Sequence, residues 1–279
     1  MSQVDLPLPG ARALAASVLA APDPPSTTLL GVADMCRRAG ALAEAGALLA
    51  RLPEGVDDGG RRGALEGQPQ AAGLTGPSPF LRRTDFLAPD DAAEVLRLAN
   101  AALADLVPSS IHNSQYDDVK LSTRRSYVAT DVDALRRVLM PHVKALVRQE
   151  DVPRRMGLAT DLPGRYELQF TAHGDGCFFK PHADARPDSN SGRAISFVYY
   201  FFNRPKRFEG GDLLLFDGDA DSGAPLPTSF TRILPEANSL VVFPSPRVHE
   251  VELVRSASPD LAAGRFTLNG WFHHPAPPG

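Results

Sequence analysis

The chain has 279 residues, with 29 lysines and arginines against 33 aspartates and glutamates, and a net charge of −4. This length suits one sizeable β domain with an appendage, and the charge gives no reason to expect nucleic acid or an anionic membrane as partner. Only Cys36 and Cys177 are present, which argues against a disulfide framework or a cysteine zinc site. We find no signal-peptide pattern and no apolar run of membrane length, so we predict a cytoplasmic protein.

The first part of the chain is predicted to be helical. Residues 1–55 are expected to be a helical extension in which residues 9–52 form two or more alanine- and leucine-rich helices, with a candidate N-cap at Ser26-Thr27-Thr28 and the longer helical pattern over residues 31–52. This extension either packs on the rest of the chain or contacts a substrate, a carrier protein or a second subunit in a homodimer. Residues 56–79 are dense in glycine, proline and polar side chains and predict a flexible linker.

The third part, residues 80–279, is predicted to be the main domain. Amphipathic helices are expected over residues 94–106 and 133–149, and short strands with glycine and proline turns follow them. This succession predicts a mainly β fold with flanking helices, a double-sheet barrel of jelly-roll type. The expected strands cover residues 165–180, 195–202, 212–216, 239–243 and 265–272, and Gly174 and Gly176 mark a turn within the first of these segments.

Two histidines and an aspartate form the candidate metal site. His182 and Asp184 are two residues apart, so an extended strand would present both side chains on one face. His249 could supply a third ligand from the downstream strands. Two imidazoles and one carboxylate are the donors that hold non-haem Fe(II) while leaving coordination positions open.

The candidate metal ligands and the expected strands, in this order along the chain, resemble the prolyl-4-hydroxylase-like branch of the Fe(II)/2-oxoglutarate-dependent dioxygenases. The resemblance covers residues 80–274. It is carried by the segments 80–87, 176–184, 196–202, 208–213, 244–251 and 264–267.

The resemblance implies a double-stranded β-helix (jelly-roll) core and three reactants at the site: Fe(II), 2-oxoglutarate as co-substrate, and O2, with ascorbate as an optional reductant. It implies that His182, Asp184 and His249 bind the iron and are the catalytic residues, and that Arg265 pairs with the distal carboxylate of 2-oxoglutarate. A planar guanidinium suits a carboxylate because it offers two parallel donors. Thr267 lies two residues on, on the same strand face, and Asn269 and Trp271 continue the alternation on that face.

Two further residues are candidates for the co-substrate pocket. His173 stands where many relatives carry a tyrosine, and it either takes part in co-substrate binding or is a polar residue of the rim. Tyr200, on the strand after the metal pair, contacts the co-substrate or packs in the core. Phe179 also replaces a common tyrosine, and residues 255–263 lengthen the usual gap before the basic residue.

The resemblance implies a hydroxylase acting on an unactivated C–H bond, with release of succinate and CO2. The expected substrate is a prolyl or other amino-acyl unit, free or in a peptide or protein. Alternatives are desaturation or cyclisation of a small biosynthetic intermediate, and a non-catalytic metal-binding sensor barrel. The aspartate at position 184 argues against halogenation, because halogenating relatives carry a small residue there.

Substrate choice is expected to lie in residues 108–130, which border the entrance in relatives. Tyr116, Arg124 and Arg125 are the candidate substrate residues. The two arginines would bind a substrate carboxylate, a phosphopantetheine arm or peptide carbonyls. The alternative is a solvated loop with incidental charges. The acidic residues 217–221 lack a complete calcium-loop pattern, so we expect them to be solvent-exposed.

Overall fold

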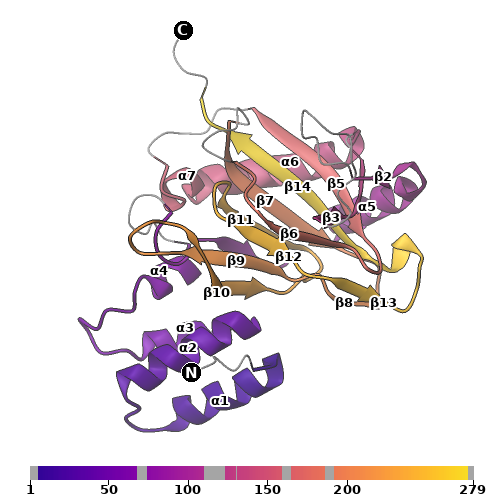
Figure 1. Cartoon of the computed structure of the whole chain (residues 1–279). Helices are drawn as coiled ribbons and strands as arrows, with labels where there is room; N and C mark the ends of the chain where they lie inside the picture. Colours follow the sequence, from indigo (N-terminus) through magenta and orange to yellow (C-terminus); the bar gives the residue numbers. More distant parts are fainter. Residues whose placement is uncertain are drawn as a thin grey trace.

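The computed structural model describes residues 6–67, 74–109, 123–129, 131–158, 165–185 and 192–275. These residues form two larger antiparallel sheets, with helices over one sheet and a helical N-terminal bundle beside the other (Figure 1). The two sheets form the double-stranded β-helix, so the predicted fold class is confirmed.

The larger sheet has seven strands in the order β1-β11-β7-β14-β5-β4-β2. Their bounds are β1 Leu81–Arg83, β2 Val107–Pro108, β4 Tyr127–Ala129, β5 Tyr166–His173, β7 Arg193–Phe201, β11 Ser239–Pro244 and β14 Arg265–His273. Alternate residues of each strand face opposite sides. Leu168, Phe170 and Ala172 of β5 therefore pack towards the helices, while Gln169 and Thr171 face a cavity between the sheets.

The smaller sheet has five strands in the order β10-β9-β12-β6-β3. Their bounds are β3 Arg124–Arg125, β6 Phe178–His182, β9 Leu213–Gly218, β10 Pro225–Ile233 and β12 His249–Val251. A further pair, β8 Phe208–Gly210 and β13 Val254–Ser256, lies in a small sheet of its own. An apolar cluster that includes Val198, Tyr200, Leu215 and Phe243 joins the two larger sheets.

Helices α5 Pro89–Ala101, α6 Asp133–Gln149 and α7 Val152–Arg155 lie on the larger sheet (Figure 1). The bounds of α6 match the prediction, since its buried residues recur at helical spacing. The helix predicted over residues 94–106 lies earlier in the chain, at residues 89–101. Helix α5 begins earlier because Pro89 suits a first helical position and two aspartates occupy the first turn. A 3-10 helix, η1 Leu103–Asp105, follows it.

Three helices, α1 Leu8–Ala20, α2 Ser26–Ala39 and α3 Leu42–Ala50, make the N-terminal bundle. The prediction of one helix over residues 31–52 was wrong. Gly40 ends α2 with a φ of +82°, a left-handed conformation that glycine adopts without strain. The three helices share their own apolar core, and α2 also packs against β10. Within the described ranges, no helix is both long and apolar enough to cross a membrane.

The described parts of residues 56–79, which are predicted to be a flexible linker, contact the rest of the chain. They include α4 Arg61–Leu65, and the backbones of Gly76 and Gly218 hydrogen-bond to each other. The Ser78 hydroxyl donates to the carbonyl of Phe216 at 2.6 Å. The division into parts at residues 55 and 79 stays a prediction.

Candidate metal centre

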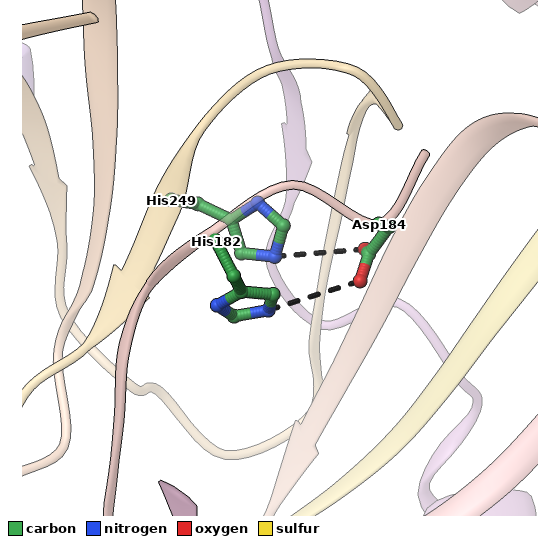
Figure 2. Close-up of side chains that lie close together, drawn as sticks. All are labelled: His182, Asp184 and His249. Atoms are coloured by element: carbon green, nitrogen blue, oxygen red, sulfur yellow. Dashed lines mark ion pairs between the residues drawn. The ribbon is translucent and has the colours of Figure 1, made fainter. Parts of the chain in front are cut away.

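Strand pairing brings His182 and His249 together. His182 ends β6 and His249 begins β12, and the two residues are directly opposite in the antiparallel register. Their rings lie 4.2 Å apart between centroids. One ligand atom from each of His182, Asp184 and His249 lies within 4.8 Å of the others, with the carboxylate facing both rings (Figure 2). The structure thus brings together all three predicted ligands in an arrangement that can hold one metal ion.

Asp184 reaches this position from a bend and not from the strand. We expected His182 and Asp184 to share one face of an extended strand, but β6 ends at His182. The backbone N–H groups of Asp184 and Ala185 both donate to the carbonyl of Ser245, at 3.0 and 3.2 Å. The turn that follows β11 therefore sets the direction of the carboxylate.

Backbone carbonyls orient both imidazoles. Nδ1 of His182 lies 2.8 Å from the carbonyl oxygen of Lys180, and Nδ1 of His249 lies 2.9 Å from that of Arg247. A proton on each Nδ1 would leave the Nε2 lone pairs free, as a metal ligand requires. The Nε2 atoms lie 3.8 Å (His182) and 3.5 Å (His249) from the nearest carboxylate oxygens of Asp184.

The surroundings favour the protonation states that bind a metal. Burial, and next the neighbouring His249, lower the pKa of His182 to about 3, so its ring is neutral. Burial raises the pKa of Asp184, but the neighbouring His249 and His182, together with the side chains of Ser196 and Trp271, lower it, and the result is a pKa below the usual range. A neutral His182 beside an ionised Asp184 supplies two of the donors expected for Fe(II).

A serine pair holds the carboxylate of Asp184. The hydroxyl of Ser196, on β7, donates to Oδ2 of Asp184 at 2.7 Å. Its oxygen also lies 2.9 Å from Oγ of Ser245, and both serines are buried. Neither serine was identified from the sequence as a partner of Asp184. A polar residue inside the apolar run 195–202 was the one available signal.

The site opens into a cavity of about 820 Å³ between the two sheets. Arg265, the first residue of β14, lies in its wall and is only 2% exposed. Its Nη1 lies 3.2 Å from Nδ1 of His173, and its Cζ lies 4.9 Å from the ring centroid of Tyr200. Among the described residues no carboxylate forms an ion pair with Arg265, and its Nε has no hydrogen-bond partner. Burial lowers its pKa.

This unpaired cation fits the anionic co-substrate that the sequence implied. A buried charge is costly unless a counter-charge compensates it, so an unpaired guanidinium in a cavity suits a carboxylate ligand. Gly211 makes room for it. A Cβ on Gly211 would lie 2.7 Å from Cδ of Arg265, and the φ of Gly211 is +70°.

The other predicted co-substrate residues surround Arg265. The hydroxyl of Tyr200 and Nε2 of His173 are buried without hydrogen-bond partners in the described part of the chain. Thr267 lies opposite Tyr200 in the strand register, and its hydroxyl donates to the carbonyl of Thr171 at 3.5 Å. His173 lines the cavity, whereas Tyr200 contacts Arg265 through its ring.

Of the three residues predicted to bind substrate, the structure places one in the cavity. Arg124 lines the cavity, with Cζ 4.8 Å from the ring centroid of Phe179, which in turn stacks on His182. Arg125 is exposed and points away, because successive strand residues face opposite sides. Tyr116 lies outside the described residues.

A second group of side chains lines the cavity near Trp271. The guanidinium of Arg193 lies 3.8 Å from the Trp271 ring centroid and forms an ion pair with Glu167. Glu167 was not predicted to line the cavity. Its position opposite Trp271 becomes clear only from the register of β5 and β14. Asn269 and Trp271 share a face with Arg265, as the alternation predicted, and both line the cavity.

Comparisons with known proteins agree with this site. Residues 168–273, which include the metal centre, match the sequence model of a family described as the 2OG-Fe(II) oxygenase superfamily. An uncharacterised PKHD-type hydroxylase of Synechocystis sp. is 31% identical over 204 residues. That match covers 70% of this chain and 63% of the relative, so it spans less than two thirds of the relative's length.

The fold is shared with a solved structure. A prolyl hydroxylase from Trichoplax adhaerens, in complex with a peptide fragment of hypoxia inducible factor, superposes with a TM-score of 0.51 at 20% identity. The match covers 70% of this chain and 83% of that one. For a prolyl-4-hydroxylase from Pseudomonas putida the TM-score is 0.48 at 22% identity, over 71% of this chain and 94% of that one.

Proposed function

Because residues 168–273 belong to the 2OG-Fe(II) oxygenase superfamily, we propose that the chain is an Fe(II)- and 2-oxoglutarate-dependent hydroxylase. The reaction would hydroxylate an unactivated C–H bond and convert 2-oxoglutarate and O2 to succinate and CO2. One observation supports the proposal most strongly: three side chains that could hold a metal ion, one buried and two half-buried, line the same cavity as a buried arginine without a carboxylate partner.

We assign roles to residues as follows. His182, Asp184 and His249 would hold Fe(II), which when bound supplies the redox chemistry that activates O2. Arg265 would bind the distal carboxylate of 2-oxoglutarate through charge-assisted hydrogen bonds. Tyr200, His173 and Thr267 would complete this pocket with polar atoms.

The rest of the cavity would hold the substrate and exclude water. Phe179 stacks on His182 at 3.4 Å between centroids, and Phe243 contacts the edge of His249 at 4.8 Å. These rings leave the imidazoles little freedom to turn. They also keep apolar surface against the metal, which protects a reactive centre from side reactions.

We propose a prolyl or other amino-acyl unit, free or in a peptide or protein, as the substrate. The support is the sequence resemblance and the hydroxylase name of the Synechocystis relative. Desaturation or cyclisation of a small intermediate begins with the same hydrogen abstraction and is the second candidate. A non-catalytic sensor is disfavoured, since the complete triad and Arg265 are all placed in one cavity.

Anaerobic reconstitution tests the cofactor assignment directly. Folded protein given Fe(II) and then 2-oxoglutarate should develop a weak visible charge-transfer band. Its absence would refute the assignment. Addition of O2 and a panel of peptides and amino acids should then yield succinate, and the product should gain the mass of one oxygen atom. Loss of two hydrogens instead would identify desaturation or cyclisation.

Three further sequence predictions remain predictions. These are ascorbate as reductant, a cytoplasmic location, and contact of the N-terminal helices with a carrier or second subunit.

A further inference from the structure

Arg124 is a second cavity-lining arginine without a carboxylate partner. It is the first residue of β3, and its side chain is turned into the cavity. Its Nε donates to the hydroxyl of Ser126 at 2.8 Å, and its Nη2 donates to Oε1 of Gln169 at 3.4 Å. Both acceptors are neutral. Within the described ranges no acidic group forms an ion pair with Arg124, and its Nη1 has no partner.

The cavity carries an excess of positive charge. The charged side chains in its described wall are four arginines and two carboxylates: Arg124, Arg136, Arg193, Arg265, Glu167 and Asp184. Glu167 already pairs with Arg193, and Arg136 pairs with Asp133 at 2.8 Å. Under the proposed function, Fe(II) and Arg265 would be balanced by Asp184 and the two carboxylates of 2-oxoglutarate. Arg124 would then be the one cavity cation still without a counter-charge.

The strand register separates Arg124 from the co-substrate pocket. Arg265 lies opposite His173 on β5, whereas Arg124 contacts Gln169 on the same strand. Four residues of a β-strand span about 13 Å. Arg124 also lies over Phe179, whose ring stacks on His182, so it is beside the metal and not beside Arg265. A ligand at Arg124 would therefore approach the metal from a different direction than the distal carboxylate at Arg265.

We propose that Arg124 binds a free carboxylate of the substrate, and that the substrate is therefore a free amino acid or the C-terminal residue of a short peptide. This inference rests on the proposed function. It narrows the substrate from any amino-acyl unit to one that carries its own carboxylate.

Contacts around Arg124 hold its guanidinium in place before a carboxylate binds. The hydroxyl of Ser126 that accepts from Nε is itself hydrogen-bonded to Ser109 Oγ at 2.9 Å, and both serines are buried. Cζ of Arg124 lies over the ring of Phe179, 4.8 Å from its centroid. A planar guanidinium held in this way loses little freedom when a carboxylate pairs with it.

Matched probes that differ only in charge test the proposal. Protein loaded anaerobically with Fe(II) and 2-oxoglutarate is titrated with free L-amino acids and with the α-amide of each, and the charge-transfer band reports binding. The best acid should bind about 10- to 100-fold more tightly than its amide. Arg124→Gln should abolish this preference, whereas Arg124→Lys should retain part of it. Arg148→Gln, which removes an exposed charge from α6, should leave it intact.

Each outcome is decisive. If no acid binds more tightly than its amide, or the preference survives in Arg124→Gln, the proposal is wrong. If Arg124→Gln weakens 2-oxoglutarate binding and leaves the preference unchanged, Arg124 belongs to the co-substrate site and the proposal is again wrong. A merely structural role would lower the melting temperature without changing the ratio of acid to amide affinity. Failure of the proposed function is separate, because the band would then be absent before any amino acid is added.

Discussion

Two fully buried arginines, Arg37 and Arg265, have opposite surroundings. Arg37 of α2 is 1% exposed and forms an ion pair with Asp217 at the end of β9. Asp217 also accepts hydrogen bonds from the Ser229 hydroxyl at 2.7 Å and the Ser78 backbone N–H at 3.2 Å. Arg265 is 2% exposed and pairs with no described carboxylate.

The difference separates a structural charge from a functional one. The ion pair between Arg37 and Asp217 joins the N-terminal bundle to the barrel and gives the buried guanidinium a counter-charge, although its Nε and Nη1 have no hydrogen-bond partner among the described residues. A buried cation without a counter-ion destabilises the folded protein unless an anion binds. Loss of the Arg37–Asp217 ion pair should therefore mainly lower the free energy of unfolding, and loss of Arg265 should mainly lower the affinity for an anionic ligand.

The largest effect is expected at the metal ligands. Asp184→Ala should abolish the charge-transfer band and succinate formation, because the remaining two imidazoles neither neutralise nor fix an Fe(II) ion. Thermal melting of the metal-free protein should change little or rise, since a buried carboxylate is removed. Substrate-dependent succinate at the wild-type rate would exclude Asp184 as a ligand.

Arg37→Met should produce the largest loss of stability. Removal of one partner from a buried ion pair leaves Asp217 uncompensated and is expected to cost about 3–5 kcal/mol in the free energy of unfolding. Urea denaturation measures this loss, and 2-oxoglutarate affinity of the folded fraction should stay unchanged.

The double variant Arg37→Met/Asp217→Leu is the matched control. It removes both charges, so it should recover much of the lost stability. Equal stability of the wild type and Arg37→Met would show that the ion pair does not hold the bundle to the barrel.

Short-range patterns account for what the sequence predicted. Alternation placed Arg265, Asn269 and Trp271 on one strand face, and the structure confirms that all three line the cavity. Helical spacing located α6, and the glycines at 174 and 176 correctly marked the turn before β6. The meeting of His182 with His249 also followed from the jelly-roll order of strands.

Contacts between distant segments account for what was missed. Asp217 was expected to be exposed with its acidic neighbours, but it is 4% exposed because Arg37, 180 residues away, supplies its counter-charge. Asp221 of that segment is exposed as expected, whereas Asp219 is half-buried and accepts a hydrogen bond from the Ser222 backbone N–H in a local turn. The hydrogen bond from Ser196 to Asp184 likewise depends on a bend whose position the turn after β11 sets.

Arg265→Gln should weaken 2-oxoglutarate binding without lowering stability. Loss of a charge-assisted pair is expected to cost about 1.5–3 kcal/mol, or roughly 10- to 150-fold in affinity. The effect on stability should be opposite to that of Arg37→Met. The free energy of unfolding should stay level or increase, because Arg265→Gln removes an unpaired buried charge. Anaerobic titration of the charge-transfer band and urea denaturation measure the two quantities. A large loss of stability with unchanged affinity would reverse the assignment of the two arginines.

Ser196→Ala gives the smallest expected effect and tests how the carboxylate ligand is held. Ser196 is the hydroxyl donor to Asp184, so its loss should weaken Fe(II) binding about tenfold while 2-oxoglutarate affinity at saturating metal stays unchanged. Ser245→Ala is the matched control, because its hydroxyl contacts Ser196 while its backbone carbonyl, which accepts from Asp184, is retained. Metal titration should therefore rank wild type, Ser245→Ala and Ser196→Ala in order of decreasing affinity. Equal affinity of all three would show that the backbone hydrogen bonds to Ser245 alone fix Asp184, and that the cavity needs no side-chain support beyond its three ligands.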